Sequence, residues 1–353
     1  MTAQNTTAPH LLDLAVLNNY LTTACPEIGH VQVAEKFAGG QSNPTFKLVT
    51  DKGVYVLRRQ PPGKLLKSAH AVDREFRVIN ALQNSEVPVP KAYHLCEDPD
   101  IIGSMFYIMA HVDGDIFWNS ALPEIENSST RATMYDEMNR VLASLHSVDV
   151  QATGLSDYGK PGSYFERQLS RWTKQYRASE LEHIEEIEHL ISYLEANLPE
   201  DDGQVSLVHG DFRLDNMMFD MSDINQPKVI AVLDWELSTL GHPYADLAYQ
   251  CMQLRLPSDI AHAAGLGGLD REALGIPSEK AYIDAYCKRR NIGEINNWTF
   301  YLAFSFFRLA AILQGVVKRA HDGNASSEKA MQLGAMVRPL AQIANQTIHQ
   351  DTE

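Results

Sequence analysis

The sequence predicts an α+β protein with a small antiparallel β-sheet in its N-terminal third and a mainly helical remainder. Apolar, β-branched runs punctuated by Gly, Asn and Pro extend to about residue 112, a pattern typical of strands and hairpins. Helical periodicity prevails after residue 115, with one β-rich insertion at residues 206–236. We therefore expect two domains, at residues 1–112 and 113–353.

The N-terminal sheet is expected to contain four short strands and one helix. The strands are expected at residues 36–37, 47–50, 54–59 and 105–110, with the extended segment VPVPKAYHL before the last of them. The helix is expected to begin at Ala71, because Val72, Phe76 and Ile79 recur at three- and four-residue spacing. Glu75 lies at the edge of this apolar stripe, which makes a purely surface role less fitting.

The helical part includes one stretch apolar enough to be compared with a membrane span. Amphipathic helices are expected at residues 133–149 and 181–198. Residues 300–317 are more apolar, but Ser305, Arg308 and Gln314 lie within them. A charged residue in the middle of a lipid bilayer is costly, so we expect a buried helix and no membrane partner.

Composition excludes several classes of protein. The 353 residues carry a formal charge of −15 with no block of Lys and Arg, so a nucleic-acid partner is not expected. The N-terminus lacks the basic segment of a secretory signal, and no C-x-x-C pair occurs. We expect a cytoplasmic protein whose cysteines are reduced and mostly buried, and leave its oligomeric state open; the cysteines are Cys25, Cys96, Cys251 and Cys287.

The strongest chemical motif is His209-Gly210-Asp211, followed five residues later by Asn216 and later by Asp234 at the end of an apolar strand. A phosphotransferase needs one carboxylate to accept the proton of the attacking hydroxyl, and oxygen ligands to hold Mg²⁺ against the phosphates. Asp211 would be the base, with Asn216 and Asp234 as the metal ligands. Alone, this short motif could equally be a capped turn.

Two further features fit a site for nucleotide phosphates. Arg58 on the strand VYVLRR and Glu75 on the next helix follow in the order expected for a phosphate-binding cation held by a helical carboxylate. Strand alternation places Arg58 and Arg59 on opposite faces, and both could instead be solvated edge charges. The preceding loop GGQS offers backbone N–H groups to a phosphate through Gly39, Gly40 and Ser42, although a Gly-Gly turn is usually just a hairpin.

The order of these parts resembles the aminoglycoside phosphotransferase and choline kinase group of protein-kinase-like small-molecule kinases. The resemblance covers about residues 37–256 and rests on VPVPKAYHL, LHSVD, LVHGDFRLDN and VLDWE. The phrases FAGGQSNPTFKL, YVLRRQPPG and LDWELSTLGHPYADLAY are most similar to the kinase-like domain associated with acyl-CoA dehydrogenases. The resemblance implies a bilobal protein-kinase-like fold, with ATP and Mg²⁺ bound between the lobes.

The resemblance also implies roles for particular residues. The lobe at 1–112 would bind the nucleotide, with the backbone of Ala110 to Val112 meeting adenine, and the lobe at 113–353 would carry catalysis and the acceptor site. Asp211 would be the catalytic base. One departure concerns Arg58, which stands where the group commonly has Lys, and Arg is a larger, forked and permanently charged donor.

The acceptor is expected to be a small molecule with a hydroxyl group, and the nearest resemblance points to a hydroxyacyl-CoA or a hydroxy acid. Glu236 and Arg308 are candidate acceptor-site residues. Glu236 could instead contact the metal or be solvated, and Arg308 could be a structural partner of a carboxylate. An aminoglycoside or amino-alcohol acceptor is the alternative within the same class.

Two different classes of function stay open. A metal-dependent phosphohydrolase would use His209, His242 and Asp246 with the aspartates as ligands, although no H-x-H or H-E-x-x-H spacing occurs. A non-catalytic binding protein could keep the kinase-like fold, and the departure at Arg58 is its main support.

Overall fold

The computed structural model divides the chain into two compact units. Unit 1 comprises Met1–Asp115, Met218–Asp220 and Ile230–Ser238, and unit 2 comprises Ile116–Met217, Met221–Val229 and Thr239–Glu353. Unit 1 therefore consists of the N-terminal third and two short segments from the middle of the chain. A division of the chain at a single residue, such as 112, does not include these two segments in the N-terminal unit. The structure describes residues 12–37, 43–61, 70–258, 265–322 and 333–351.

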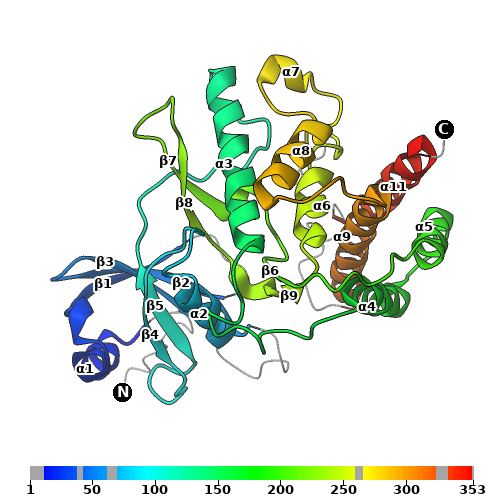
Figure 1. Cartoon of the computed structure of the whole chain (residues 1–353). Coiled ribbons are helices and arrows are strands. Elements are labelled where there is room, and N and C mark those ends of the chain that lie inside the picture. The colour runs from blue at the N-terminus through cyan, green and yellow to red at the C-terminus, as the bar shows by residue number, and fades with distance from the viewer. Residues whose placement is uncertain (1–11, 38–42, 62–69, 259–264, 323–332, 352–353) are drawn as a thin grey trace. The chain divides into compact units, whose positions relative to one another are not determined.

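Unit 1 contains a five-stranded antiparallel sheet in the order β1-β2-β3-β5-β4 (Figure 1). Its strands are β1 (Val31–Lys36), β2 (Thr45–Thr50), β3 (Val54–Arg59), β4 (Ala92–Cys96) and β5 (Phe106–Ala110). The expected strand at 36–37 is misplaced, because Lys36 is the last residue of β1. β1 lies at the edge of the sheet, and Val31 is its only buried residue. The segment VQVAEK therefore has too few apolar residues for its alternation to predict a strand.

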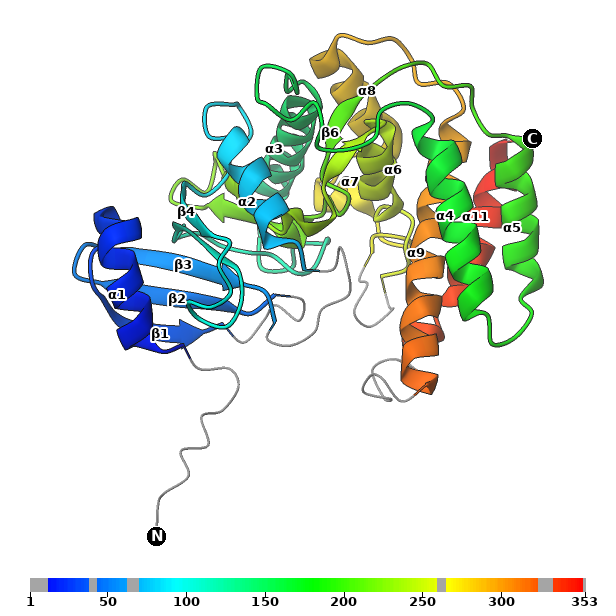
Figure 2. The same ribbon diagram turned by 90° about the horizontal axis from the view of Figure 1, so that it is seen from below.

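One face of this sheet is closed by helix α1 (Leu14–Ala24), as Figure 2 shows. Asp13 caps the helix by accepting hydrogen bonds from the backbone N–H groups of Ala15 and Val16. Leu17 and Leu21 of α1 join a buried apolar cluster with residues of the strands. The strand members of this cluster include Phe46, Leu48, Tyr55, Leu57, Phe106 and Ile108.

The register of the sheet decides where the two adjacent arginines of β3 point. Leu57 lies in the apolar cluster with α1, so its neighbour Arg58 projects from the opposite face. Arg58 is paired across the strands with Tyr107 of β5. Helix α2 (Val72–Ala81) packs against β4 and β5. Arg59 instead donates to the carbonyl oxygen of Ile102 at 3.3 Å, and the two arginines therefore have different partners.

Unit 2 is mainly helical, with one small pair of strands, β6 (Ser206–Val208) and β9 (Thr239–Gly241). A second small pair joins β7 (Met217–Asp220) to β8 (Lys228–Val232), and most of its residues belong to unit 1. The helices are α3 (Ser128–His146), α4 (Tyr164–Ser179), α5 (Glu185–Ala196), α6 (Tyr244–Met252), α7 (Arg271–Leu274), α8 (Glu279–Arg290), α9 (Trp298–His321) and α11 (Val337–Asp351). The α+β class expected from the sequence is confirmed.

Helix α9 is the central element of unit 2. It packs against α4, α5, α6 and α11, and the ribbons of α4, α5 and α11 run alongside it in Figure 2. In the described part of the chain, it alone is long and apolar enough to cross a membrane by length and composition, and 72% of its most apolar window is buried within the protein. The expectation of a buried helix here is confirmed.

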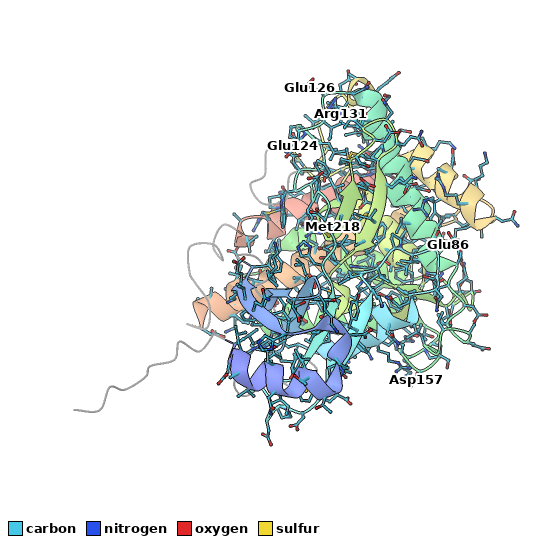
Figure 3. The ribbon with its side chains drawn as sticks, turned by 90° about the vertical axis from the view of Figure 1, so that its left-hand side faces the viewer. Glu86, Glu124, Glu126, Arg131, Asp157 and Met218 are labelled. Atoms are coloured by element: carbon cyan, nitrogen blue, oxygen red, sulfur yellow. The ribbon has the colours of Figure 1, made fainter. Side chains whose placement is uncertain are left out.

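Side-chain contacts from α3 hold the loops around it. Arg131, labelled in Figure 3, donates to the backbone carbonyl oxygens of Leu274 at 2.7 Å and of Ile125. A buried guanidinium with several donors can satisfy more than one backbone carbonyl in this way.

All four cysteines are unpaired and buried, as expected.

Candidate active site

In unit 1, Arg58 is surrounded by three carboxylates. Its guanidinium forms a two-pronged pair with Glu75, with Nε to Oε2 at 2.8 Å and Nη2 to Oε1 at 3.0 Å. Nη2 also donates to Oδ1 of Asp234 at 2.7 Å, and Oε2 of Glu236 lies 3.8 Å away. This arrangement uses the fork of arginine, because a lysine amine could not contact Glu75 through two parallel bonds.

Burial and charge make this cluster electrostatically unusual. Glu75 is 1% exposed, and burial raises its pKa to about 7, although Arg58 opposes that rise. Asp234 and Glu236 add to the rise by repulsion. Burial disfavours the charge of Arg58, but Glu75, Tyr107 and Asp234 together raise its pKa. The guanidinium of Arg58 is therefore the shared partner of three carboxylates. The hydroxyl of Tyr107 also donates to Glu75, at 3.4 Å.

Asp234 is held in an uncommon backbone conformation. It follows β8 and has φ 63° and ψ 60°, in the left-handed region, where a residue with a side chain pays about 1 kcal/mol or more. The next residue, Trp235, is buried and donates through Nε1 to the carbonyl oxygen of Val232 at 2.9 Å. Strain of this kind persists only where the surroundings fix it, and it is concentrated at functional positions.

The raised pKa of Glu75 predicts a pH effect on stability. Between about pH 4.5 and pH 7, the folded protein keeps a proton on Glu75 that the unfolded chain has released. Raising the pH through this window favours unfolding, so the wild type should lose on the order of 2 kcal/mol of stability relative to Glu75→Gln, which cannot titrate. Urea unfolding of both proteins across this range checks it. A difference that does not change with pH would contradict the assignment.

In unit 2, the loop after β6 holds Asp211 and Asn216 together. Gly210 has φ 86°, which favours glycine at the centre of the His-Gly-Asp motif. Nδ2 of Asn216 donates to the backbone oxygen of Asp211 at 2.8 Å and to its Oδ2 at 3.1 Å. Within the described residues, this leaves Oδ1 of Asn216 without a hydrogen-bond donor. Nε of Arg213 lies 3.2 Å from Oδ1 of Asp211.

A buried carboxylate, Asp246 of α6, supports this loop. It accepts backbone N–H bonds from His209 at 2.6 Å and from Gly210 at 2.9 Å, and Nε2 of His146 lies 3.4 Å away. Burial by itself would raise the pKa of Asp246, but these partners hold it below the usual value. Nδ1 of His146 is in turn 2.7 Å from the hydroxyl of Tyr286. These contacts give Asp246 a structural role in holding the loop after β6.

Replacing Asp246 by Ala is expected to destabilise the protein by about 3 kcal/mol or more. Two buried N–H groups would each lose their acceptor, at about 1–3 kcal/mol apiece. Denaturant unfolding measures the change. The matched control is Asp284→Asn, which removes an exposed pair with Lys280 and should cost about 0.5 kcal/mol or less. Equal stability of the two variants would contradict the supporting role of Asp246.

Arg308 of α9 contacts the same loop through its backbone. Nη2 donates to the carbonyl oxygen of Gly210 at 2.6 Å. The guanidinium lies 5.2 Å from the ring centroid of Tyr249 and 5.8 Å from that of Trp172, within the range of cation–π attraction. Burial raises the pKa of Tyr249, and Asp211 adds to that rise. Arg308 therefore contacts Gly210, the residue that precedes the expected base Asp211. It has no carboxylate partner among the described residues.

The remaining expected nucleotide contacts lie in unit 1. The backbone N–H of Ala110 donates to the carbonyl oxygen of Lys91 at 2.8 Å, and that of His111 donates to the carbonyl oxygen of Val54 at 3.4 Å. The backbone of Val112 makes no hydrogen bond within the described part of the chain, so it can pair with a ligand. Gly39, Gly40 and Ser42 lie outside the described residues.

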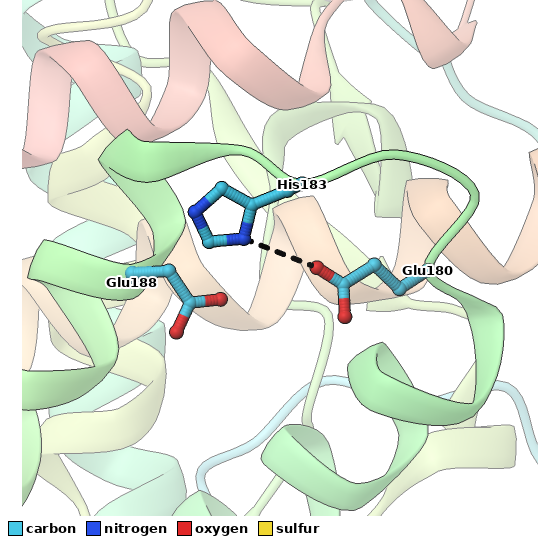
Figure 4. Close-up of side chains that lie close together, drawn as sticks. All are labelled: Glu180, His183 and Glu188. Atoms are coloured by element: carbon cyan, nitrogen blue, oxygen red, sulfur yellow. Dashed lines mark ion pairs between the residues drawn. The ribbon is translucent and has the colours of Figure 1, made fainter.

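Three acidic groups of unit 1 could hold a metal ion, because ligand atoms of Glu75, Asp234 and Glu236 lie within 4.8 Å of one another. Another such group, shown in Figure 4, joins Glu180, His183 and Glu188. Its carboxylates already pair with Arg177, which weakens a metal interpretation.

The histidines of the hydrolase alternative have other partners. His209 is fully buried, and His242 pairs with Asp202 at 3.2 Å. Among the described residues, neither histidine belongs to a group of three suitable ligands. A zinc site of the hydrolase type has no counterpart in that part of the structure.

The sequence matches one family model, described as the phosphotransferase enzyme family, over residues 33–279. The chain belongs to this phosphotransferase family. A solved structure described as a putative aminoglycoside phosphotransferase from Ralstonia eutropha is 45% identical, with a TM-score of 0.87, and the match covers 96% of this chain and 99% of the other. The family resemblance and the kinase-like fold expected from the sequence are confirmed.

Curated relatives of this phosphotransferase-family chain are longer proteins. Acyl-CoA dehydrogenase family member 10 of Mus musculus is 49% identical over 88% of this chain and 28% of its own length. Acyl-CoA dehydrogenase family member 11 of Rattus norvegicus is 43% identical over 94% of this chain and 43% of its own. The chain thus spans less than half the length of these relatives. A distant phosphotransferase, APH(4)-Ia, in a ternary complex with AMP-PNP and hygromycin B shares the fold at 14% identity, with a TM-score of 0.62 over 94% of this chain and 98% of that one.

Within this phosphotransferase-family chain, the structure separates the expected residues into two groups. Unit 1 brings together Arg58, Glu75, Asp234 and Glu236, and unit 2 brings together Asp211, Asn216 and Arg308. Sequence reasoning assigned no role to Tyr107 or His146. His146 lies within the phrase LHSVD, and a histidine among apolar helix positions was the available signal for a buried polar contact.

Proposed function

We propose that this chain transfers the γ-phosphoryl group of ATP to a hydroxyl group of a small molecule. The observation that carries this proposal is the geometry around Arg58, whose guanidinium is fixed by Glu75 and directed at Asp234. A phosphate-binding cation oriented by a buried glutamate is what a kinase requires, and a solvated edge charge would not be held in this way. Membership of the phosphotransferase family supports the same reaction class.

Each unit offers an oxygen donor that suits a hard divalent cation. Asp234 and Asn216 offer a carboxylate and an amide oxygen, and such oxygens suit Mg²⁺ better than zinc. Oδ1 of Asn216 is the atom left over after Nδ2 is engaged by Asp211. When bound, Mg²⁺ would neutralise negative charge on the phosphates. The distant relatives solved with AMP-PNP or ADP support a nucleotide substrate for this chain.

Asp211 would act as the base that orients the acceptor hydroxyl and accepts its proton. Its side chain is 24% exposed and is held by Asn216 on one oxygen and Arg213 near the other. Asp246 fixes the preceding backbone through His209 and Gly210. These contacts pre-orient the carboxylate, so positioning and electrostatics would supply most of the rate.

We propose a hydroxyacyl-CoA or a hydroxy acid as the acceptor. The support is the similarity to proteins named acyl-CoA dehydrogenase family members, over nearly the whole of this chain. Arg308 also places a cation, and not a carboxylate, beside Gly210. A polycationic aminoglycoside would bind more favourably to acidic side chains at this position.

The test is turnover of the purified chain with ATP, Mg²⁺ and a panel of acceptors. The panel comprises hydroxyacyl-CoAs, the free hydroxy acids, aminoglycosides and amino alcohols. The proposal expects ADP release that depends on the acceptor, and a product heavier by one phosphoryl group in mass spectrometry. Acceptor-independent release of inorganic phosphate would favour the hydrolase class, and nucleotide binding without turnover would favour a binding protein.

A further inference from the structure

Unit 2 carries a basic pocket that the proposed reaction does not yet use. The pocket has a volume of about 790 Å³ and lies along the first turns of α4 and the loop before it. Its lining is Lys160, Pro161, Gly162, Ser163, Glu166, Arg167, Ser170, Arg171 and Lys174. Four cations thus face one carboxylate, on a chain whose formal charge is −15.

The four cations of this pocket outnumber the one carboxylate in its lining, Glu166. Within the described part of the chain, none of the four forms an ion pair. Arg167 is oriented by its own loop, because Nη2 donates to the carbonyl oxygen of Lys160 at 2.5 Å and Nη1 lies 3.4 Å from that of Pro161. Unpaired cations gathered in one concave site create a positive potential that attracts anions.

The pocket is connected to the catalytic loop through one aromatic ring. The guanidinium of Arg171 lies 5.2 Å from the ring centroid of Trp172, and that of Arg308 lies 5.8 Å from the same centroid. Arg308 in turn donates to the carbonyl oxygen of Gly210, the residue before Asp211. One cation of the pocket, Arg171, and the cation at the expected base, Arg308, therefore both lie close to the ring of Trp172.

Tyr164 also lies near the cations of the pocket and near Arg308. Burial raises the pKa of Tyr164, the first residue of α4, and three arginines oppose that rise through their charge. These arginines are Arg308, Arg171 and Arg167. Arg167 and Arg171 of the pocket and Arg308 at Gly210 thus lie close enough to Tyr164 for their charges to act on the same side chain.

We propose that this basic pocket binds the phosphate groups of the acceptor, and that the acceptor is therefore a coenzyme A thioester and not a free hydroxy acid. The inference rests on the proposed phosphotransferase function and adds the site that selects its substrate. Arginine side chains bind phosphate oxygens through paired hydrogen bonds, whereas one carboxylate would need only one such partner.

The spacing of the cations suits a ligand with several separated phosphates. Arg167, Arg171 and Lys174 recur at four- and three-residue spacing and so share one face of α4. They span about 10 Å along the helix axis. Coenzyme A carries a diphosphate and a separate ribose phosphate, and its pantetheine arm would extend the acyl group away from them toward Arg308 and Asp211. A polycationic acceptor would be repelled by the same surface.

The first experiment compares two acceptors that differ only in the phosphate-bearing part. A hydroxyacyl-CoA and the matching hydroxyacyl pantetheine thioester are each titrated with saturating ATP and Mg²⁺. The wild type should show a KM about tenfold or more lower for the CoA thioester, because charge-assisted phosphate contacts are lost in the other. In Arg171→Gln/Lys174→Gln, the ratio of the two KM values should fall toward one. The exposed Lys280→Gln should retain the wild-type ratio.

The second experiment measures binding without turnover. Free coenzyme A is titrated into the wild type, the double variant and the control by calorimetry, at low and high salt. We expect binding that weakens with salt and falls about tenfold in the double variant only. Inorganic diphosphate is the comparison anion, and it should compete more weakly than coenzyme A.

The outcomes separate the two proposals. Equal KM values for both thioesters in the wild type would overturn the phosphate-binding pocket and leave the kinase function intact. Pocket-dependent binding of coenzyme A without phosphorylation of any hydroxyl would support the pocket and overturn the kinase function. Diphosphate binding as strong as that of coenzyme A, or coenzyme A binding unaffected by the double variant, would contradict the acceptor assignment.

Discussion

Replacing Asp211 by Asn is expected to lower phosphoryl transfer by about 10²–10⁴-fold while nucleotide binding persists. The amide cannot accept the hydroxyl proton, and general-base catalysis is worth about this factor. The change preserves size, and Asn216 can still donate to the backbone oxygen of residue 211. Turnover is measured by ADP release with a hydroxyacyl-CoA, and nucleotide binding by calorimetry.

The control for this variant is Asp215→Asn, which lies on the same loop and pairs with Arg213 at 2.8 Å. It removes one carboxylate from the loop without touching the proposed base, so turnover should stay within about tenfold of wild type. If Asp211→Asn kept wild-type turnover, Asp211 would not be the base. Loss of nucleotide binding together with turnover would indicate a role in holding the nucleotide instead.

The second large effect is expected at Asp234. In the wild type, ATP with Mg²⁺ at 100 times its Kd should stabilise the folded state by about 2.7 kcal/mol, since the stabilisation by a ligand that binds only the folded state grows with the logarithm of ligand concentration over Kd. Asp234→Asn should abolish the part of this stabilisation that depends on Mg²⁺. Thermal unfolding with ATP, with and without Mg²⁺, measures the effect.

Asn is the suitable replacement because the backbone of residue 234 is left-handed. Asn adopts this region more readily than most residues, so the apo protein should keep its fold. The matched control is Asp100→Asn, an exposed aspartate of unit 1, which should retain the full shift. A Mg²⁺-dependent shift of wild-type size in Asp234→Asn would contradict the role of Asp234 as a metal ligand.

The strands that the sequence predicted well are those whose apolar residues are buried. Residues 54–59 coincide with β3, and residues 105–110 begin one residue before β5. Helix α1 was missed, although Asp13 precedes Leu14, Leu17 and Leu21 in a capped apolar stripe. Its apolar residues close the sheet face through contacts distant in sequence, which local periodicity cannot show.

In the candidate site, too, the sequence predicted the local features and missed the contacts between distant segments. The spacing of Asp211 and Asn216 is local, and strand alternation correctly separated Arg58 from Arg59. The sharing of Arg58 by Asp234 and Glu236 depends on two segments far apart in the chain that fold into one unit. The basic pocket was also missed, because its cations are spread over residues 160–174 and become a cluster only on the face of α4.

The most direct test of the central claim follows the phosphoryl group itself. ATP labelled at the γ-phosphate is incubated with the chain, Mg²⁺ and a hydroxyacyl-CoA, and the label is located after separation of the products. The proposed function predicts label on the acyl hydroxyl with the wild type, and at most about one hundredth of that rate with Asp211→Asn. Label found only in inorganic phosphate, or only in unreacted ATP, would contradict it.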